Sequence, residues 1–318
     1  MKKFPKIVFI GSTHFSLSSL RELHIKKYNI VGIVTIPDLP FHKKNKKYFS
    51  PVKKYALEKN IPFLQPINLT ENSFLRNLKL WNADIQIVVA FKFLPKKVWN
   101  IPKFGTFNLH ASLLPQYRGA APINWVIING ENKTGLTTFL VEEKIDCGKI
   151  ILQKEIKIGK QETAGELEKR LKKISGSIII KTLEGIIKNT IKPIPQKKID
   201  ILINAPKISN KDCRIEWNKP SIESIYNKIR GLCPYPTAWT LLFLNKKIMR
   251  FKIFTVKKIL KKHSFPIGSI LINSLYEMKV SVKEGFISII EGQIEGRKRM
   301  NVKNLINGIK IKKNIFVQ

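Results

Sequence analysis

Short β-branched runs alternate with helical patterns from Lys6 to about Leu140. Strands that alternate with helices are typical of βαβ units, in which helices cover a mostly parallel sheet. Ligands of such sheets lie at the carboxyl ends of the strands. The pattern therefore predicts an α/β domain with a mostly parallel sheet. Its expected strands are Ile7 to Ile10, Ile30 to Thr35, Ile85 to Ala90, Thr106 to His110 and Gly135 to Val141.

A long helix is predicted next, from Thr163 to about Asn189. Thr163 is the expected cap, and Glu166 three residues later completes a capping box. The prolines of Ile191-Lys192-Pro193-Ile194-Pro195-Gln196 end any helix, because proline lacks the backbone N–H that a helix needs. A linker is therefore expected from these prolines to about Pro206.

After Ser209 the pattern changes to one helical segment, 221–231, followed by short alternating strands. Several short strands with turns between them predict a small β-barrel. The 318 residues are enough for two domains that each bury a core. We therefore expect domains at 1–190 and 207–318, with a linker at 191–206. The expected barrel strands are Trp239 to Leu244, Met249 to Val256, Ser269 to Ile272 and Val280 to Val282.

The chain is strongly basic, with 58 Lys and Arg against 22 Asp and Glu and a net charge of +36. A polyanionic partner would explain this charge through phosphate neutralisation and counterion release. Lys, Ile and Asn are abundant throughout, however, as a codon bias toward AT would produce, and we assign about half of the charge to that drift. No apolar run approaches the length that crosses a bilayer, which predicts a soluble protein.

The beginning of the chain and its cysteines indicate the compartment. Met1-Lys2-Lys3 precedes an apolar stretch that is too short for a secretory signal, and no small-x-small cleavage site follows. Cys147, Cys213 and Cys233 are too few and too scattered for a disulfide framework or a metal site of known spacing. A cytoplasmic protein without a metal is therefore expected.

The most informative stretch runs from Asn108 to Pro122. Asn108 and His110 stand two apart at the end of an expected strand, so their side chains point the same way. One is a neutral hydrogen-bond donor, and the other can change protonation near neutral pH. Facing a ligand, the two could polarise a carbonyl group. Taken alone, a buried structural histidine is the commoner use of such a residue.

This stretch resembles the signature of the methionyl-tRNA formyltransferases, with Asn-x-His, then Ser-Leu-Leu-Pro, then Arg-Gly-Ala-Ala-Pro. The resemblance covers most of the chain and weakens over roughly the last fifty residues. It implies a Rossmann-like catalytic domain followed by an OB-like barrel. Further blocks in the family's order are Ile10-Gly11-Ser12-Thr13-His14-Phe15, Pro37-Asp38-Leu39-Pro40, Ser50-Pro51-Val52-Lys53, Val89-Ala90-Phe91, Asp146-Cys147-Gly148, Arg214-Ile215-Glu216-Trp217, Ile229-Arg230 and Pro234-Tyr235-Pro236-Thr237-Ala238-Trp239.

The resemblance implies that Asn108, His110 and Asp146 form the catalytic set. Formyl transfer to an amine needs a carbonyl that is held still, an oxyanion stabiliser and an acceptor for the amine's proton. Asn108 and His110 can donate to the oxyanion, while Asp146 can orient His110, steer a water or accept the proton. The alternative for Asp146 is an ordinary turn carboxylate.

The resemblance also implies that the formyl donor is 10-formyltetrahydrofolate. The segment 112–115 offers backbone groups, one hydroxyl and two apolar side chains, a mixture that suits a polar-edged heterocycle. The segment 89–91 would line the pterin pocket, with Lys92 where the family has a glycine. Without their flanking residues, Leu113 and Leu114 would be assigned to the core. The expected folate-binding residues are Ser112, Leu113, Leu114, Pro115, Val89, Ala90 and Phe91.

The loop 42–47 is too highly charged to pack, and a solvated insertion is the ordinary explanation for such a run. In the family that the chain resembles, the equivalent loop inserts into the acceptor arm of methionyl initiator tRNA. Lys43 matches an arginine there and keeps the charge without the bidentate fork, and Leu39 replaces a basic residue. The expected tRNA-binding residues are Lys43, Lys44, Lys46 and Lys47.

Three other functions are alternatives to this one. A folate-dependent formyltransferase or hydrolase that acts on a small amine shares the chemistry but would not need a basic C-terminal domain. A dinucleotide oxidoreductase is disfavoured, because the turn 11–15 lacks the second and third glycines of the phosphate-binding fingerprint. An inactive RNA-binding protein would not need the intact catalytic set. We therefore expect a monomeric enzyme, without a membrane partner, that formylates methionyl initiator tRNA.

Overall fold

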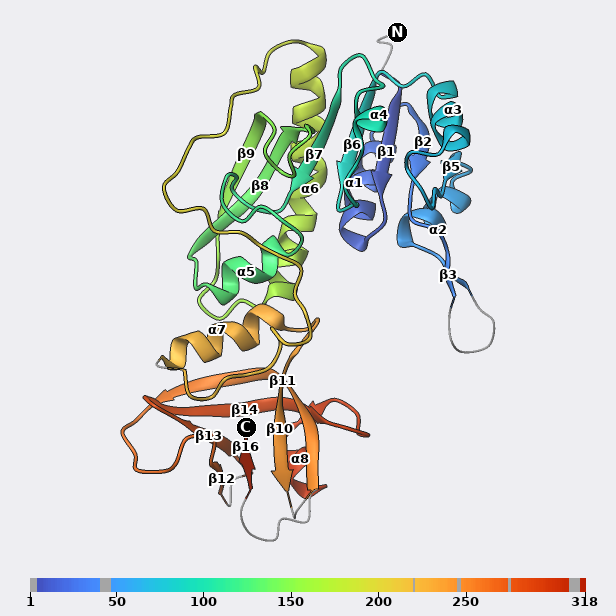
Figure 1. The fold of residues 1–318 in the computed structure, drawn as a ribbon. Helices are drawn as coiled ribbons and strands as arrows, with labels where there is room; N and C mark the ends of the chain where they lie inside the picture. The colour runs from blue at the N-terminus through green and yellow to red at the C-terminus, as the bar shows by residue number, and fades with distance from the viewer. Residues whose placement is uncertain (1–4, 41–46, 220, 245–246, 274–275, 309–314) are drawn as a thin grey trace. The chain divides into compact units, whose positions relative to one another are not determined.

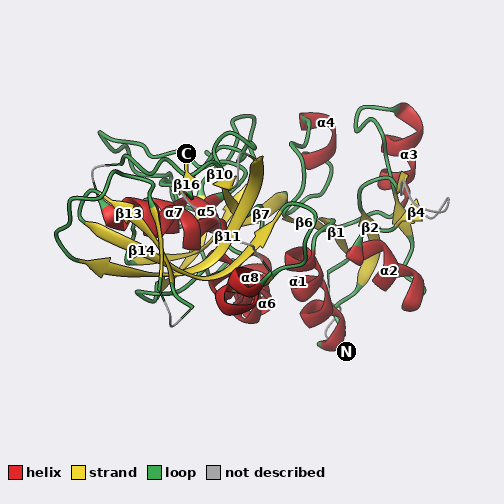
Figure 2. Cartoon of the chain, turned by 90° about the horizontal axis from the view of Figure 1, so that it is seen from below, coloured by secondary structure: helices red, strands yellow, loops and turns green. Residues whose placement is uncertain are grey.

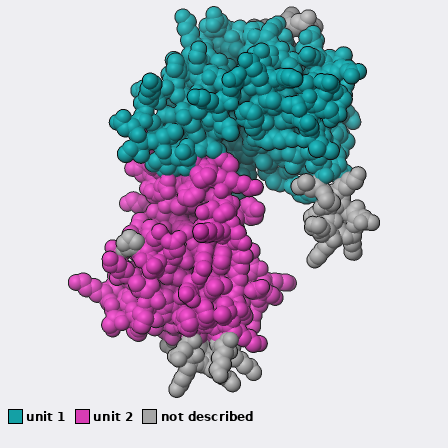
Figure 3. Space-filling view, in the orientation of Figure 1, with its two compact units in different colours: residues 1–119, 134–156, 168–204 teal, residues 120–133, 157–167, 205–318 magenta. Residues whose placement is uncertain are grey.

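The computed structural model describes residues 5–40, 47–219, 221–244, 247–273, 276–308 and 315–318, with the elements labelled in Figure 1. The chain forms two compact units that are not continuous in sequence (Figure 3). The first comprises 1–119, 134–156 and 168–204, and the second comprises 120–133, 157–167 and 205–318. Each unit is built on its own sheet.

The sheet of the first unit has the strand order β5-β2-β1-β6-β7-β8-β9. From β5 to β7 all neighbours are parallel, and β8 pairs with β7 in the antiparallel sense. This arrangement confirms the mostly parallel α/β sheet, whereas β5 and β9 were not predicted. The strands are β1 (Ile7–Gly11), β2 (Ile30–Val34), β5 (Phe63–Leu64), β6 (Ile85–Val89), β7 (Thr106–His110), β8 (Lys133–Leu140) and β9 (Ile150–Lys157).

Helices cover both faces of the strands β1, β2 and β6 (Figure 2). On one face, α3 (Asn72–Leu80) and α4 (Lys96–Trp99) contribute Phe74, Leu78 and Val98 to a cluster with strand residues such as Val8. The opposite face is covered by α1 (His14–Ile25). Because the sheet is covered on both faces, β1 is buried at every residue and is continuously apolar or glycine. The helix α2 (Pro51–Glu58) also belongs to the first unit.

The predicted long helix is α6 (Ala164–Ile187). The amide of Thr163 donates to Oε2 of Glu166 at 2.8 Å, and the amide of Glu166 donates to Oγ1 of Thr163 at 3.3 Å. These two reciprocal bonds are the capping box, and they satisfy amide groups that a helix start otherwise leaves without partners. The prediction of the helix and of its cap is therefore confirmed.

The second unit contains an antiparallel sheet in the order β12-β13-β14-β11-β10-β16, with β15 beside β14. A bridge between Ser269 and Phe316 joins the two ends of this order, so the sheet is a nearly closed barrel, as predicted. The helices of this unit include α5 (Pro122–Ile128), α7 (Ile222–Leu232), which was predicted, and α8 (Val302–Asn307). The strands are β10 (Ala238–Leu244), β11 (Lys247–Leu260), β12 (Ile270–Ile272), β13 (Met278–Val282), β14 (Gly285–Ile294), β15 (Met300–Asn301) and β16 (Phe316–Val317).

Within the described residues, no helix is both long enough and apolar enough to span a membrane.

Candidate active site

Asn108 and His110 lie on β7, as the sequence predicted. In the parallel ladder with β6, Asn108 is paired with Val88, and in the antiparallel ladder with β8, His110 is paired with Thr137. Side chains alternate between the two faces of a strand, so Asn108 and His110 share one face. His110 is 6% exposed, which places its ring where water is largely excluded.

The ring of His110 is held at Nε2. This atom lies 2.8 Å from the backbone oxygen of Tyr117. Because a carbonyl oxygen only accepts, the hydrogen bond requires a proton on Nε2. The other ring nitrogen, Nδ1, lies 3.7 Å from Oδ2 of Asp146, which is an ion-pair distance but longer than a hydrogen bond. The structure thus brings His110 and Asp146 together.

Asp146 is placed by the loop between β8 and β9. Its backbone has φ +53°, a conformation that non-glycine residues rarely adopt, and its Oδ2 accepts a 2.9 Å hydrogen bond from the amide of Gly119. Gly148 allows the loop to return against β8, because a Cβ added there would lie 1.7 Å from the backbone oxygen of Leu140. The Asp146 carboxylate is therefore positioned by the conformation of its own loop and by the hydrogen bond from Gly119, which follows β7.

Asn108 contributes a polar atom that the protein leaves free. Its Oδ1 is buried and has no hydrogen-bond partner among the described residues. Buried polar groups are nearly always hydrogen-bonded, so this exception on the strand face that His110 shares needs an explanation. A ligand group that donates a hydrogen bond to Oδ1 of Asn108 supplies one.

The residues expected to bind folate fall into two groups. Val89, Ser112 and Leu114 are buried and make interior contacts: the Val89 oxygen accepts from Ser16 Oγ at 2.6 Å, and Ser112 Oγ donates to the Gln116 oxygen at 2.7 Å. Leu114 belongs to a core cluster. The residues of this set that retain exposed surface are Ala90, which has φ +48°, Phe91, Leu113 and Pro115.

Most of the lysines expected to contact tRNA lie outside the described residues. Lys43, Lys44 and Lys46 lie outside the described residues, and Lys47 belongs to β4 (Lys47–Tyr48). This strand pairs in the antiparallel sense with β3 (Leu39–Pro40). The Lys-rich segment therefore connects the two strands of a short hairpin.

One residue near the site was missed by sequence reasoning. Gln196, assigned to the linker by its two neighbouring prolines, bonds to the backbone of Asp146 and to Arg118. Its local sequence gives no sign of this, because the partners come from other parts of the chain. Arg118 belongs to the family-like motif but had no role assigned from the sequence.

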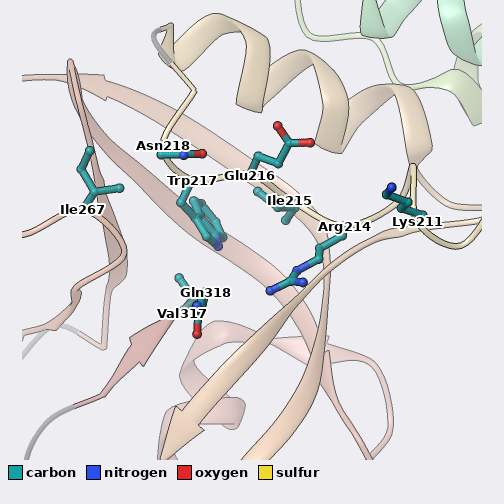
Figure 4. A pocket seen from close by; sticks show the side chains of 9 residues that line it. All are labelled: Lys211, Arg214, Ile215, Glu216, Trp217, Asn218, Ile267, Val317 and Gln318. Atoms are coloured by element: carbon teal, nitrogen blue, oxygen red, sulfur yellow. The ribbon is translucent and has the colours of Figure 1, made fainter.

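The second unit contains a separate cavity of about 540 Å³. Arg214, Ile215, Glu216 and Trp217, one of the family-like blocks, form part of its wall (Figure 4). Trp217 is 4% exposed and its Nε1 donates to Thr240 Oγ1 at 2.9 Å, so this block also serves the barrel core. None of the expected catalytic residues lines this cavity.

No group of His, Cys, Asp and Glu side chains suited to a metal ion occurs in the part of the chain that the structure describes.

Comparisons with known proteins agree with this architecture. The formyl transferase family model matches residues 5–183, and the model of the formyl transferase C-terminal domain matches residues 207–310. Among solved structures, HypX from Aquifex aeolicus in complex with tetrahydrofolic acid has a TM-score of 0.63 at 16% identity, over 99% of this chain and 50% of that chain. An N-formyltransferase from Helicobacter canadensis has a TM-score of 0.64 at 19% identity, over 93% and 100%. At these identities the structures are similar in fold alone.

Curated relatives are much closer in sequence. A methionyl-tRNA formyltransferase of Bacteroides thetaiotaomicron is 43% identical over 98% of this chain and 97% of its own length. Those of Azobacteroides pseudotrichonymphae and Flavobacterium johnsoniae are 46% and 45% identical, over 95% and 96% of this chain and the same shares of their own lengths. The chain therefore belongs to the methionyl-tRNA formyltransferase family.

Proposed function

We propose that this enzyme transfers the formyl group of 10-formyltetrahydrofolate to the amino group of methionine carried on initiator tRNA. The observation that carries the proposal is the pairing of His110 with Asp146 at 3.7 Å, on the strand face that Asn108 shares. Relatives at 43% to 46% identity bear the name of this activity. In this proposal residues 1–190 perform the chemistry and residues 207–318 contact RNA, with 191–206 between them.

The three side chains divide the polar work of the reaction. As the amine nitrogen bonds to the formyl carbon, negative charge develops on the formyl oxygen, and Asn108 and His110 donate hydrogen bonds to it. Nε2 of His110 already donates to Tyr117, so Nδ1 is the nitrogen that faces the reaction. Donation from both nitrogens requires the doubly protonated ring, whose positive charge then faces the carboxylate of Asp146. Asp146 accepts the proton that the amine loses. The bond between the formyl carbon and N10 of the folate then breaks, and N10 takes up a proton as tetrahydrofolate leaves.

The residues at the site suit a folate as co-substrate. The folate supplies the formyl carbon. Oδ1 of Asn108 is buried and accepts from no described residue, and Phe91, Leu113 and Pro115 offer partly exposed apolar surface for a flat ring. Ala90, with its positive φ, turns the chain at the end of β6 beside the paired strand β7, so its backbone borders the same edge of the sheet.

The proposed contact with tRNA rests on Lys43, Lys44, Lys46 and Lys47, which stand in or next to the connection between β3 and β4. Cations so closely spaced along the sequence suit a phosphate backbone, because each lysine can neutralise one phosphate and release counterions. The net charge of +36 gives the same chain a long-range attraction for RNA.

The experiment that tests the proposal compares methionyl initiator tRNA, methionyl elongator tRNA and free methionine as acceptors, with 10-formyltetrahydrofolate as donor. Formylation of the initiator alone, lost in His110→Ala, is the expected result. Absence of product on every charged tRNA, with tetrahydrofolate still released, would replace the proposal with a formyltransferase of small amines or a hydrolase.

A further inference from the structure

Gln196 joins the two loops that hold the catalytic pair. Its Oε1 accepts from Nη2 and Nε of Arg118 at 2.6 and 3.2 Å. Its Nε2 donates to the backbone oxygens of Asp146 and Gly148 at 2.7 and 2.9 Å. Arg118 lies in the loop after β7, and Asp146 lies in the loop between β8 and β9. One side chain therefore ties both loops together.

The amide of Gln196 is fully used. A primary amide has two N–H donors and an oxygen with two acceptor sites, and here each of the four is engaged. Gln196 is half-buried, whereas its neighbours Pro195 and Lys197 are exposed. No other side chain of this length both accepts from a guanidinium and donates to two carbonyls, since glutamate has no donor when ionised and asparagine is shorter by one methylene.

The bonds to the carbonyls act on the conformation that orients the Asp146 carboxylate. Asp146 has φ +53°, which persists only where surrounding contacts hold it. Gln196 binds the backbone oxygens of this residue and of Gly148 two positions later, so it holds the backbone of the turn, whereas the Gly119 amide holds the carboxylate. Without these bonds the carboxylate loses a constraint on its distance from His110.

The segment that follows Gln196 holds the other partner of His110. Gln116 donates from Nε2 to the oxygen of Ile201 at 2.9 Å and accepts from the amide of Ile203 at 2.7 Å. The amide of Tyr117, whose oxygen receives Nε2 of His110, donates to the oxygen of Ile203 at 2.6 Å. Residues 196–203 thus run along both loops of the site as a strap.

We infer that Gln196 is a positioning residue for formyl transfer, acting through Asp146, and that residues 196–203 are a strap for the catalytic pair. The expected effect on kcat rests on the proposed function, whereas the expected effect on the loop conformation rests on the hydrogen bonds alone. Gln196 does not touch the reacting atoms in this scheme. It sets where the carboxylate stands when the amine gives up its proton.

The test uses Gln196→Glu, which keeps the acceptor for Arg118 and loses both donors to the carbonyls. A displacement of a catalytic group by about 1 Å can lower the rate by about 100-fold. We therefore expect kcat to fall by about 10- to 100-fold, while KM for tRNA stays within about threefold of the wild-type value. The same change at the exposed Gln161, Gln161→Glu, should leave both constants unchanged. Gln196→Ala serves as the second variant and should lower kcat at least as far.

A double variant separates positioning from general damage. If Gln196 acts through Asp146, then Gln196→Glu added to Asp146→Asn should lower kcat by less than about threefold further, because residues that act as a unit are not additive. Equal fold-losses in both backgrounds would overturn the inference, as would a wild-type kcat in both Gln196 variants.

A measurement without substrate tests the strap independently of the proposed function. Hydrogen exchange of a peptide covering residues 141–149 should speed up in Gln196→Glu and not in Gln161→Glu. Unchanged exchange there would refute the strap even if the enzyme formylates tRNA. Faster exchange in Gln196→Glu, together with a wild-type protein that formylates no tRNA, would uphold the strap and reject the function.

Discussion

Nζ of Lys53 lies 2.6 Å from Oδ2 of Asp38, and the two side chains are only 10% and 19% exposed. This ion pair joins two of the family-like blocks, with Asp38 directly before β3 and Lys53 at the start of α2. Oδ1 of Asp38 also accepts from Nε2 of Gln65 at 2.9 Å, and the Lys53 ammonium lies 4.2 Å from the centre of the Phe49 ring. Both charges are therefore compensated in a largely buried place.

Replacing one member of this pair should destabilise the first unit. Lys53→Met removes the Lys53 ammonium from the largely buried Asp38 carboxylate, and we expect a loss of about 3 kcal/mol in the free energy of unfolding. Asp38→Asn combined with Lys53→Met should recover part of this loss, because the carboxylate charge is then removed as well. Urea unfolding measures both, with Lys54→Met at an exposed neighbouring position as control. A Lys53→Met protein as stable as Lys54→Met would show that the pair contributes nothing.

His110→Ala should lower kcat while leaving tRNA binding almost unchanged. The imidazole is expected to act on the oxyanion and the proton, and such a group contributes about 10²- to 10⁴-fold to the rate. Single-turnover kinetics and a filter-binding titration with methionyl initiator tRNA give the two quantities separately. A loss of the same size in rate and in affinity would assign His110 a structural role.

Asp146→Asn should keep the loop in place and remove the proposed proton acceptor. The amide oxygen of asparagine can still accept from the Gly119 amide, as Oδ2 of Asp146 does at 2.9 Å. We therefore expect a fold-loss in kcat of about 10² or more, together with an unchanged thermal midpoint. A kcat within about threefold of wild type would exclude Asp146 as the base.

Gly148→Ala tests the close approach of the Asp146 loop to β8. The added carbon would meet the Leu140 oxygen at 1.7 Å, so the loop must move and carry the carboxylate with it. We expect a destabilisation of about 1–3 kcal/mol and a fall in kcat of about tenfold or more. Gly159→Ala, where the nearest side-chain atom would be 3.2 Å away, is the matched control for the loss of a glycine. Equal effects at the two positions would argue against a specific contact at Gly148.

Sequence patterns predicted those features whose causes are local. The capping box of Thr163 and Glu166 spans three positions, and the shared face of Asn108 and His110 follows from strand alternation. The strand β5 has only two residues, Phe63–Leu64, and is too short to leave a periodic pattern. Gln196 could not be recognised because its partners Asp146 and Arg118 are 50 and 78 positions away, and the two prolines that precede it are typical of a linker.

Substitutions in the Lys-rich segment can show whether its positive charges bind tRNA or merely reflect the codon bias of the whole chain. Replacing Lys43, Lys44, Lys46 and Lys47 with Ala together should raise KM for initiator tRNA and reduce the slope of log affinity against log salt by about three to four, since each phosphate contact contributes about one. Four exposed lysines, three in α6 and one directly after it, provide a control with the same change in net charge: Lys169, Lys173, Lys181 and Lys188. If both quadruple variants reduce the slope equally, tRNA responds to overall charge alone, and the proposed contact through the β3–β4 connection is wrong.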